Sequence, residues 1–275
     1  MNVGNKQWQR VVLKFTDGDN YIMSIVLKDD SMVLNTADTV DTVISPVMPY
    51  DSLIMAGNQD METSFRLRRY GDVMSQVTLT GPWTFNQPGF KADGSALAYF
   101  DVDVSQQIPR TLLVTGKFNK GARIAGISFD NPNQLKSFYV ERGSGASGSG
   151  FPSNRFIPVW AGAAIGDAAK GLTMDSDPEG ALTLFISGDE SGTRWGVVYN
   201  GMIKSIAKDT TYALSTSIGR TRIGGSSAQQ TGAAIAAHNI FAAASFSSIL
   251  SDTDLLQMGS FMNDYAADMG AEMYE

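Results

Sequence analysis

Three carboxylates lie close together in the middle of the chain, in the segment Asp175-Ser176-Asp177-Pro178-Glu179. Such a group could do acid–base chemistry, because glycoside hydrolysis uses two carboxyl groups that flank the bond to be broken. Alternation along a strand would place a catalytic pair on one face, but Pro178 and the following Gly180 favour a loop. We therefore interpret the segment as a solvated turn and not as a catalytic strand.

His238 is the single histidine and the only candidate for a serine–histidine catalytic group. It stands at the start of an alanine-rich, alternating segment, whereas a triad needs a nucleophile and an orienting acid beside the imidazole. No Gly-x-Ser-x-Gly elbow leads from a strand into a helix, and the chain has no cysteine to act as a nucleophile. These observations favour a structural histidine and a protein that is not an enzyme.

Metal ligands are equally sparse. Asp17-Gly18-Asp19 has the spacing that begins a calcium loop, but the third ligand and the bidentate glutamate of such a loop are missing. The segment therefore predicts a turn between two strands. We expect no cofactor; a Ca²⁺ ion held by loop oxygens stays an open option that no residue pattern supports.

Charge limits the range of partners. The net charge is -7 and the isoelectric point is about 4.8. Proteins that bind nucleic acid present basic surfaces, so this balance argues against nucleic acid and against anionic membranes. The N-terminus lacks the apolar core of a signal peptide, and no apolar run is long enough for a transmembrane helix. We expect no membrane partner.

One basic segment stands out in this acidic chain. Residues 65–70 read FRLRRY and include Arg66, Arg68 and Arg69. A solvated strand face is one interpretation of this alternation. The other is an assembly interface, in which the guanidinium groups pair with carboxylates of a partner or of another subunit.

Short alternating segments separated by turn residues run through most of the chain. A turn between residues 8–15 and 21–27 predicts a hairpin, and an irregular stretch follows it, so we interpret residues 1–70 as an assembly arm. Residues 71–275 form the main domain, because closely spaced strands are typical of a sandwich or jelly roll. Its expected strands include residues 96–102, 110–118, 122–129, 136–142, 156–161, 181–186, 193–199, 202–206, 212–218 and 221–223.

The C-terminal region changes its period. Residues 240–247 alternate like a strand, and this predicts that the even-numbered residues share one face. Beyond residue 250 the apolar residues recur at helical spacing. Ser251 with Asp254 three positions later predicts a capping box, so the strand should run into a short amphipathic helix.

These C-terminal elements resemble the laminin-G/concanavalin-A-like jelly rolls. Members of that group typically carry a strand with Arg-Ile-Gly, a polar loop, a strand with spaced Phe, Ala and Phe, and then Ser-Asp and a short helix. The resemblance implies a mainly β sandwich from about residue 77 to residue 265. The matching residues are Arg222-Ile223-Gly224, Phe241, Ala243, Phe246, Leu250, Ser251, Asp252, Leu255 and Met258, and Tyr199-Asn200-Gly201 resembles a hairpin turn of the group.

The resemblance also bears on function. Hydrolases of this group often carry Glu-x-Asp-x-x-Glu on a strand, a motif that this chain lacks. Lectin-like members bind glycans through loops with Asp, Asn, Gly and an aromatic platform. Trp195 and Tyr199 share a strand face with Val197, so core packing is the alternative for these two. The glycan-binding candidates that the resemblance implies are Trp160, Trp195, Tyr199, Asp189 and Asn200, with Trp83 as a further aromatic residue.

The main functional interpretation is a structural role in a viral particle, that of a tailed bacteriophage. It depends on the missing signal peptide, cysteine and catalytic group, and on the Gly-, Ser-, Thr- and Ala-rich β architecture. We expect a non-enzymatic virion protein, such as a capsid decoration, fibre-base or tail component. It would form a homo-oligomer, with a trimer as one option, and contact other virion proteins or host-surface glycans. A lectin-like carbohydrate-binding module is the alternative.

Overall fold

The computed structural model describes residues 8–14, 22–28, 45–55, 76–81, 83–84, 89–92, 99–103, 110–127, 138–145, 151–160, 167–214, 220–224 and 238–275. The chain divides into two compact units, Met1–Ile44 and Ser45–Glu275. The first contains the predicted hairpin, in which β1 (Trp8–Lys14) and β2 (Ile22–Lys28) pair antiparallel. The second begins well before the boundary expected near residue 70, because β3 (Ser52–Met55) pairs with a strand near the C-terminus.

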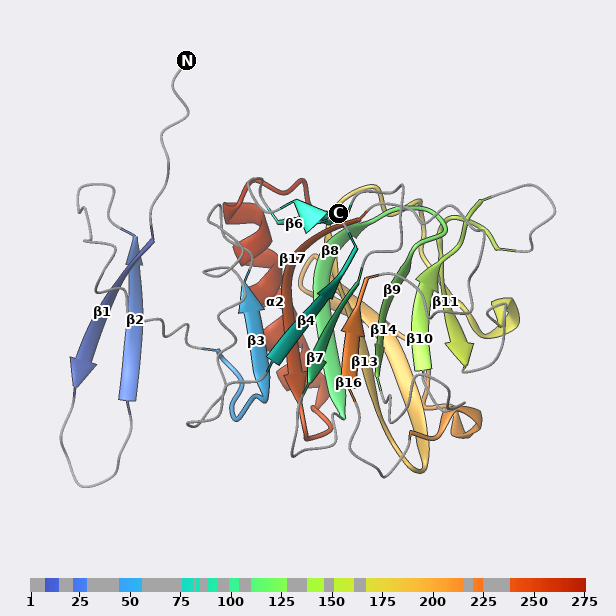
Figure 1. Cartoon of the computed structure of the whole chain (residues 1–275), viewed down its shortest axis with the longest axis horizontal. Coiled ribbons are helices and arrows are strands. Elements are labelled where there is room, and N and C mark those ends of the chain that lie inside the picture. Colours follow the sequence, from blue (N-terminus) through green and yellow to red (C-terminus); the bar gives the residue numbers. More distant parts are fainter. Residues whose placement is uncertain are drawn as a thin grey trace, which may run out of the picture. The chain divides into compact units, whose positions relative to one another are not determined.

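The second unit is a sandwich of two antiparallel sheets, which confirms the predicted fold class (Figure 1). The first sheet contains β4 (Gln76–Thr80), β7 (Tyr99–Asp103), β9 (Arg123–Ile127), β10 (Phe138–Arg142), β11 (Arg155–Trp160), β12 (Leu172–Thr173) and β16 (Arg220–Ile223). The second contains β3, β5 (Trp83–Thr84), β6 (Phe90–Ala92), β8 (Thr111–Phe118), β13 (Leu182–Asp189), β14 (Gly192–Tyr199), β15 (Met202–Ser205) and β17 (His238–Phe246). The orders are β12-β11-β10-β9-β16-β7-β4 and β15-β14-β13-β8-β17-β6-β5, with β3 beside β17.

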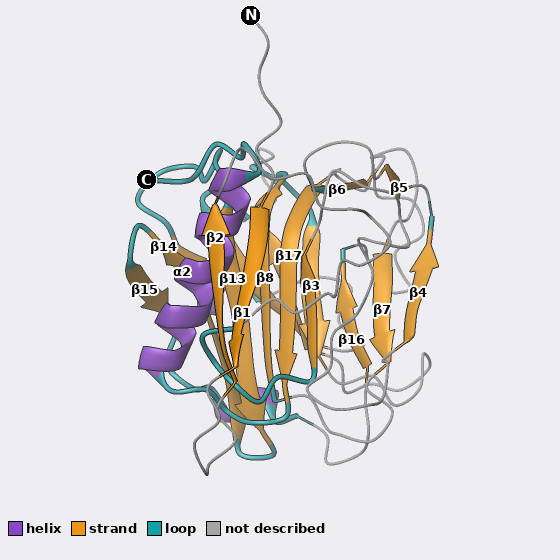
Figure 2. Ribbon diagram, turned by 90° about the vertical axis from the view of Figure 1, so that its left-hand side faces the viewer, coloured by secondary structure: helices purple, strands orange, loops and turns teal. Residues whose placement is uncertain are grey.

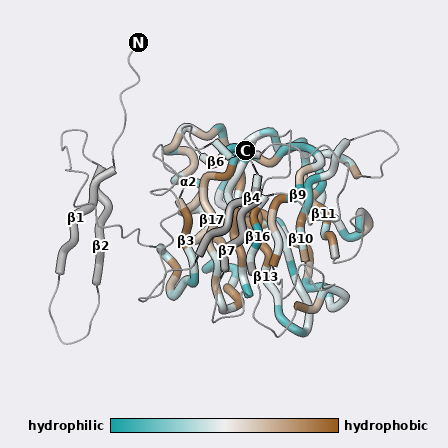
Figure 3. Tube along the Cα trace, in the orientation of Figure 1, coloured by the Kyte–Doolittle hydropathy of each residue, from teal (hydrophilic) through white to brown (hydrophobic). Residues whose placement is uncertain are grey.

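The core between the sheets is apolar, because alternate residues of each strand face inward. On β14, Trp195, Val197 and Tyr199 lie in this core, as their shared face predicts. The Trp195 ring packs against Phe138 of β10, with 5.3 Å between ring centroids, and against Tyr212 at 5.7 Å. Figure 3 shows hydrophobic residues along the strands and hydrophilic residues at many of the turns.

The helix α2 (Asp252–Asp268) packs against β8, β13, β14 and β17 of the eight-stranded sheet (Figure 2). It begins with the predicted capping box: the Ser251 hydroxyl accepts from the Asp254 N–H, and the Asp254 carboxylate accepts from the Ser251 N–H. Gly259 permits close packing, since a Cβ at this position would lie 2.7 Å from the Val198 side chain. The predicted apolar positions of the helix, Leu255, Met258 and Met262, are buried.

One strand departs from the predicted alternation. The register of β17 against β8 shifts between Ile240 and Ala242. Ile240 and Ala243 consequently both lie in the core between the sheets, while Phe241 clusters with Ala266 of α2. The prediction that the even-numbered residues of 240–247 share one face is therefore wrong, because a bulge adds one residue to the strand.

A second difference concerns the strand expected at residues 212–218. Tyr212 instead ends a 3₁₀ helix, η2 (Thr210–Tyr212). Asp209 caps this turn, since its side chain accepts from the Thr211 N–H at 2.8 Å. Residues 215–219 lie outside the described residues. A similar short turn, η1 (Ala168–Lys170), precedes β12.

Candidate functional site

The carboxylate cluster of the sequence lies in the loop between β12 and β13, residues 174–180, which we call the acidic loop. It has no regular secondary structure, as Pro178 and Gly180 predict. Its three carboxylates are nonetheless all paired with cations. Asp175 lies 2.8 Å from a lysine of β15, and Asp177 and Glu179 lie 2.8 and 3.3 Å from another lysine.

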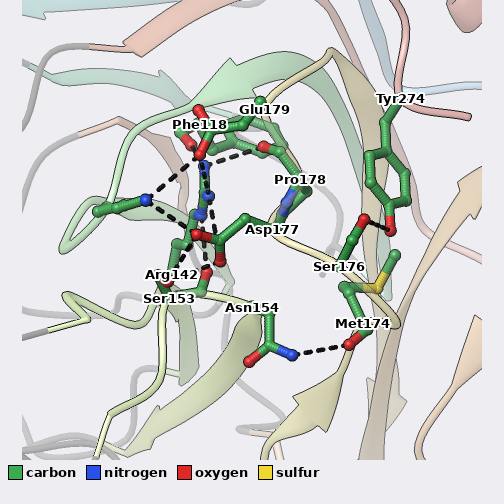
Figure 4. A network of polar contacts seen from close by, with 11 residues as sticks. Phe118, Arg142, Ser153, Asn154, Met174, Ser176, Asp177, Pro178, Glu179 and Tyr274 are labelled. Atoms are coloured by element: carbon green, nitrogen blue, oxygen red, sulfur yellow. Dashed lines mark hydrogen bonds and ion pairs between the residues drawn. The ribbon is translucent and has the colours of Figure 1, made fainter.

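Arg142, at the end of β10, holds the acidic loop from one side (Figure 4). Its side chain is 2% exposed. One terminal nitrogen donates to the carbonyls of Phe118 and Pro178 at 2.5 and 2.9 Å, and Nε donates to the Ser153 carbonyl at 2.9 Å. The other terminal nitrogen lies 3.5 Å from the Glu179 carboxylate. One guanidinium therefore ties together the end of β8, the turn before β11 and the acidic loop.

Lys120 and Ser153 complete this Arg142 network, which we define as Lys120, Arg142, Ser153, Asp177 and Glu179. The Ser153 hydroxyl donates to Asp177 at 2.6 Å. Hydrogen bonds from Lys120 first, and then from Ser153, lower the pKa of the Asp177 carboxyl. Burial lowers the pKa of the Arg142 guanidinium, although the two carboxylates oppose this effect. An ionised carboxylate has no proton to donate, so Asp177 is not suited to act as a general acid. The network instead holds the acidic loop in place.

The other side of the acidic loop meets the C-terminal segment. The hydroxyl groups of Ser176 and Tyr274 are 3.0 Å apart (Figure 4). The Tyr274 ring packs on Tyr199, with 5.2 Å between centroids, and is partly buried against the core. Lys204 of the edge strand β15 donates to Asp175 at 2.8 Å. This bond is the main reason why the pKa of Lys204 is raised.

Backbone contacts fix the position of Tyr274. The Ala181 N–H donates to the Glu272 carbonyl at 2.7 Å, and the Tyr274 N–H donates to the Ala181 carbonyl at 2.8 Å. The C-terminal segment thus runs parallel to the start of β13. Gly180 allows this approach, because a Cβ there would lie 2.4 Å from backbone atoms of the C-terminal segment.

The turn after Tyr199 is the hairpin that the sequence predicts. Asn200 and Gly201 have φ of 45° and 65°, as a two-residue turn with both central residues left-handed requires. Asn200 is exposed and directly follows the tyrosine on which Tyr274 packs. We call Asp175, Ser176, Asn200, Lys204 and Tyr274 the tyrosine edge.

The structure does not bring together those predicted glycan-binding residues whose side chains it describes. Trp195 is 0% exposed and Tyr199 is 8% exposed, so neither ring offers a face on which a sugar could stack. Their assignment to a glycan site is corrected to core packing, the alternative that the sequence left open. Asp189 and Asn200 flank opposite ends of β14 and therefore cannot share one small site.

Asp189 is the last residue of β13, next to the turn into β14, and it forms an ion pair there. Its carboxylate accepts from Lys208 at 2.6 Å and from the Ser191 hydroxyl at 2.6 Å. These bonds lower the pKa of Asp189 to about 2. The side chains of Trp160 and His238 lie outside the described residues, as do Arg66, Arg68 and Arg69.

Sequence reasoning missed two residues of this region, Arg142 and Tyr274. Arg142 had a signal, because it shares strand parity with Phe138 and Val140, which both lie in the core. A cation on an inward face needs several hydrogen-bond partners. Tyr274 had no comparable signal, since its contacts come from segments far away in the sequence.

The described parts of the chain contain neither a metal site nor a membrane-spanning helix. No group of three or more His, Asp or Glu residues there is arranged to hold a metal ion. No helix there is long and apolar enough to cross a membrane. The calcium-like turn at residues 17–19 lies outside the described residues.

No protein-family model and no curated protein matches the chain. Among solved structures, Trypanosoma rangeli sialidase in complex with sialic acid matches with a TM-score of 0.53 and 13% identity, over 80% of this chain and 36% of the sialidase. The botulinum neurotoxin serotype C1 binding domain matches with a TM-score of 0.48 and 12% identity, over 78% of this chain and 52% of that domain's chain. The Ruminococcus gnavus IT-sialidase CBM40, bound to α2,3-sialyllactose, matches with a TM-score of 0.39 and 13% identity, over 56% of this chain and 83% of the CBM40 chain. The sialidase likeness shows the fold alone, and the two lower scores add no argument.

Proposed function

We propose that the sandwich is a carbohydrate-binding module without enzymatic activity and that the tyrosine edge is its ligand surface. The observation that carries this proposal is the convergence of a partly exposed aromatic ring with several polar groups. Tyr274 lies 3.0 Å from Ser176, and Lys204 lies 2.8 Å from Asp175 at the same edge. Sugars suit such a surface, because ring carbons pack on an aromatic face while hydroxyls exchange hydrogen bonds with fixed polar groups.

The fold likeness gives the proposal general support. The sialidase that shares this architecture was solved in complex with sialic acid. At 13% identity, and with this chain spanning about a third of the sialidase, no binding residue carries over. The ligand surface is therefore argued from the side chains of this chain alone.

Two features favour binding over catalysis. Asp177 and Glu179 are held by Lys120, at 2.8 and 3.3 Å, and by the buried Arg142. Most glycoside hydrolases use one carboxyl group that stays protonated near neutral pH, and the lowered pKa of Asp177 is the opposite of that condition.

The virion role, the homo-oligomer and the virion location expected from the sequence remain predictions. None of the structures named above is described as a virion component. Light scattering on the full chain would test the oligomer. If Arg66, Arg68 and Arg69 form an assembly interface, their joint replacement by glutamate should reduce the measured mass. A monomeric native chain would contradict the assembly prediction.

A glycan array probed with the full chain tests the proposed function. We expect binding to at least one class of glycan and a loss of about tenfold or more in Tyr274→Ala, since 1.4 kcal/mol corresponds to tenfold in affinity. Ile249→Ala is the matched control, because Ile249 is 49% exposed and lies outside the tyrosine edge. Trp195→Ala would be uninformative, because this buried side chain supports the fold. The proposal fails if no glycan binds or if Tyr274→Ala binds like the native chain.

A further inference from the structure

Most described cations of this protein already have a carboxylate partner within 4 Å. This holds at the acidic loop, at the turn between β13 and β14 and at the start of α2. The pairs are Arg110–Glu190, Lys117–Glu272, Lys120–Asp177, Lys120–Glu179, Arg123–Glu141, Arg142–Asp177, Arg142–Glu179, Lys170–Asp209, Arg194–Asp252, Lys204–Asp175 and Lys208–Asp189.

The cation of the tyrosine edge is also paired with a carboxylate. Its one cation, Lys204, is bonded at 2.8 Å to Asp175, and the Asp175 side chain is 84% exposed. A ligand that approaches Tyr274 therefore meets an ion pair whose carboxylate is largely exposed and whose ammonium group is already bonded. The next cations along the acidic loop are equally engaged: Arg142 is buried, and Lys120 faces two carboxylates.

We infer that the tyrosine edge selects neutral, hydroxyl-rich glycans and rejects glycans that carry a carboxylate, with Asp175 as the residue that sets this preference. The inference rests on the proposed function of the same edge. A carboxylated sugar needs an available cationic donor, and it could reach Lys204 only by displacing the carboxylate of Asp175. A neutral sugar has no such requirement, because its hydroxyls can donate to the exposed carboxylate of Asp175 and exchange hydrogen bonds with the hydroxyls of Ser176 and Tyr274.

The matched part is 36% of the sialidase, so the ligand of that structure carries over to no site of this chain. Sialic acid carries a carboxylate, and the sialidase was solved in complex with it. The net charge of -7 adds a long-range repulsion of anionic ligands. Ligand choice depends on the side chains of a site and not on the fold, so the sialic acid of that structure does not predict the ligand of this chain.

The test uses the full chain on an array that carries neutral oligosaccharides beside their sialylated forms, including lactose and α2,3-sialyllactose. We expect each bound neutral glycan to be preferred over its sialylated form by about tenfold or more. Asp175→Asn should reduce that preference severalfold, because it frees the Lys204 ammonium group for a carboxylate. Asp268→Asn, on α2, removes one negative charge outside the tyrosine edge and should leave the ratio unchanged.

The outcomes separate the two claims. Tighter binding of the sialylated members would overturn the inference and leave the carbohydrate-binding function standing. An unchanged ratio in Asp175→Asn, or an equal change in Asp268→Asn, would overturn the role of Asp175. No binding to any pair would overturn both the inference and the function on which it rests.

Discussion

Asp177 of the acidic loop and Asp189 at the end of β13 have similar partners in different surroundings. Each accepts a hydrogen bond from a serine hydroxyl at 2.6 Å. Each also pairs with a lysine, at 2.8 Å for Asp177 and at 2.6 Å for Asp189. The difference lies behind the carboxylate: Asp177 faces Arg142, which is 2% exposed and bonded to three carbonyls.

Burial, and not the list of partners, should decide how much each site contributes to stability. Exposed ion pairs contribute between zero and about 1 kcal/mol, because water and salt compete with them. Removing a buried arginine leaves carbonyl groups without donors, and each buried orphan costs about 1–3 kcal/mol. The Arg142 network should therefore support the fold, while the Asp189 pair should affect its own turn.

Arg142→Met should produce the largest effect. The methionine fills similar volume but offers no donor to the carbonyls of Phe118, Ser153 and Pro178. We expect a loss of about 2–4 kcal/mol in the free energy of unfolding, measured by urea denaturation. Lys208→Met removes the cation beside Asp189 and is the control, with an expected loss below about 1 kcal/mol. Equal losses in the two variants would contradict the importance of burial.

Asp177→Asn should have an intermediate effect. Arg142 keeps its three carbonyl partners and Glu179 in this variant, but Lys120 and Ser153 lose a charged acceptor. We expect a loss of about 1 kcal/mol, since hydrogen bonds to charged groups are the stronger kind. The same urea titration measures it. A loss as large as that of Arg142→Met would mean that the carboxylate, and not the carbonyls, holds the arginine.

The sequence predicts the fold far better than it predicts this network. Alternation and turn residues are local, so they locate most strands of the sandwich, and Ser251 with Asp254 locates the start of α2. The bulge at Phe241 was not predictable, because it depends on how β17 pairs with β8. The 3₁₀ turn at Tyr212 depends on a cap from Asp209, a signal that was present and weaker than the strand pattern.

The candidate site was less predictable for a physical reason. The acidic loop was correctly predicted to be a loop, but its cations come from β10, β15 and the turn after β8. The partners of a carboxylate are set by tertiary packing, which one-dimensional spacing does not contain. The aromatic residue type alone does not identify a ligand-binding ring. Trp195 belongs to the core, whereas Tyr274 is positioned by backbone pairing near Gly180.

Low pH should remove the small contribution of the Asp189–Lys208 ion pair to the stability of the fold. Its pKa of about 2 lies below the ordinary value of 3.8, so the pair stabilises the fold above about pH 4 and loses that effect as pH falls towards about 2. Asp189→Asn should be less stable than the native chain by below about 1 kcal/mol near neutral pH, with the gap closing in acid. The hydrogen bond from Lys170 lowers the pKa of Asp209 to about 2 as well. The stability gap between the native chain and Asp209→Asn should therefore also close in acid. A gap that widens in acid would contradict the sign of the pKa shift.

Salt should produce the smallest effect and most directly separate the exposed Asp189 pair from the buried Arg142 site. The Debye length falls from about 10 Å at 0.1 M to about 3 Å at 1 M, so an exposed pair is screened while a buried one is screened much less. The cost of Asp189→Asn should therefore shrink by a few tenths of a kcal/mol in about 1 M sodium chloride. The cost of Arg142→Met should stay constant, because most of it comes from carbonyls that lose their donors and not from Coulomb attraction. Urea titrations of both variants at low and high salt measure this. If the two costs shrink together, Arg142 acts as a surface charge despite its burial, and the contrast between Asp177 and Asp189 disappears.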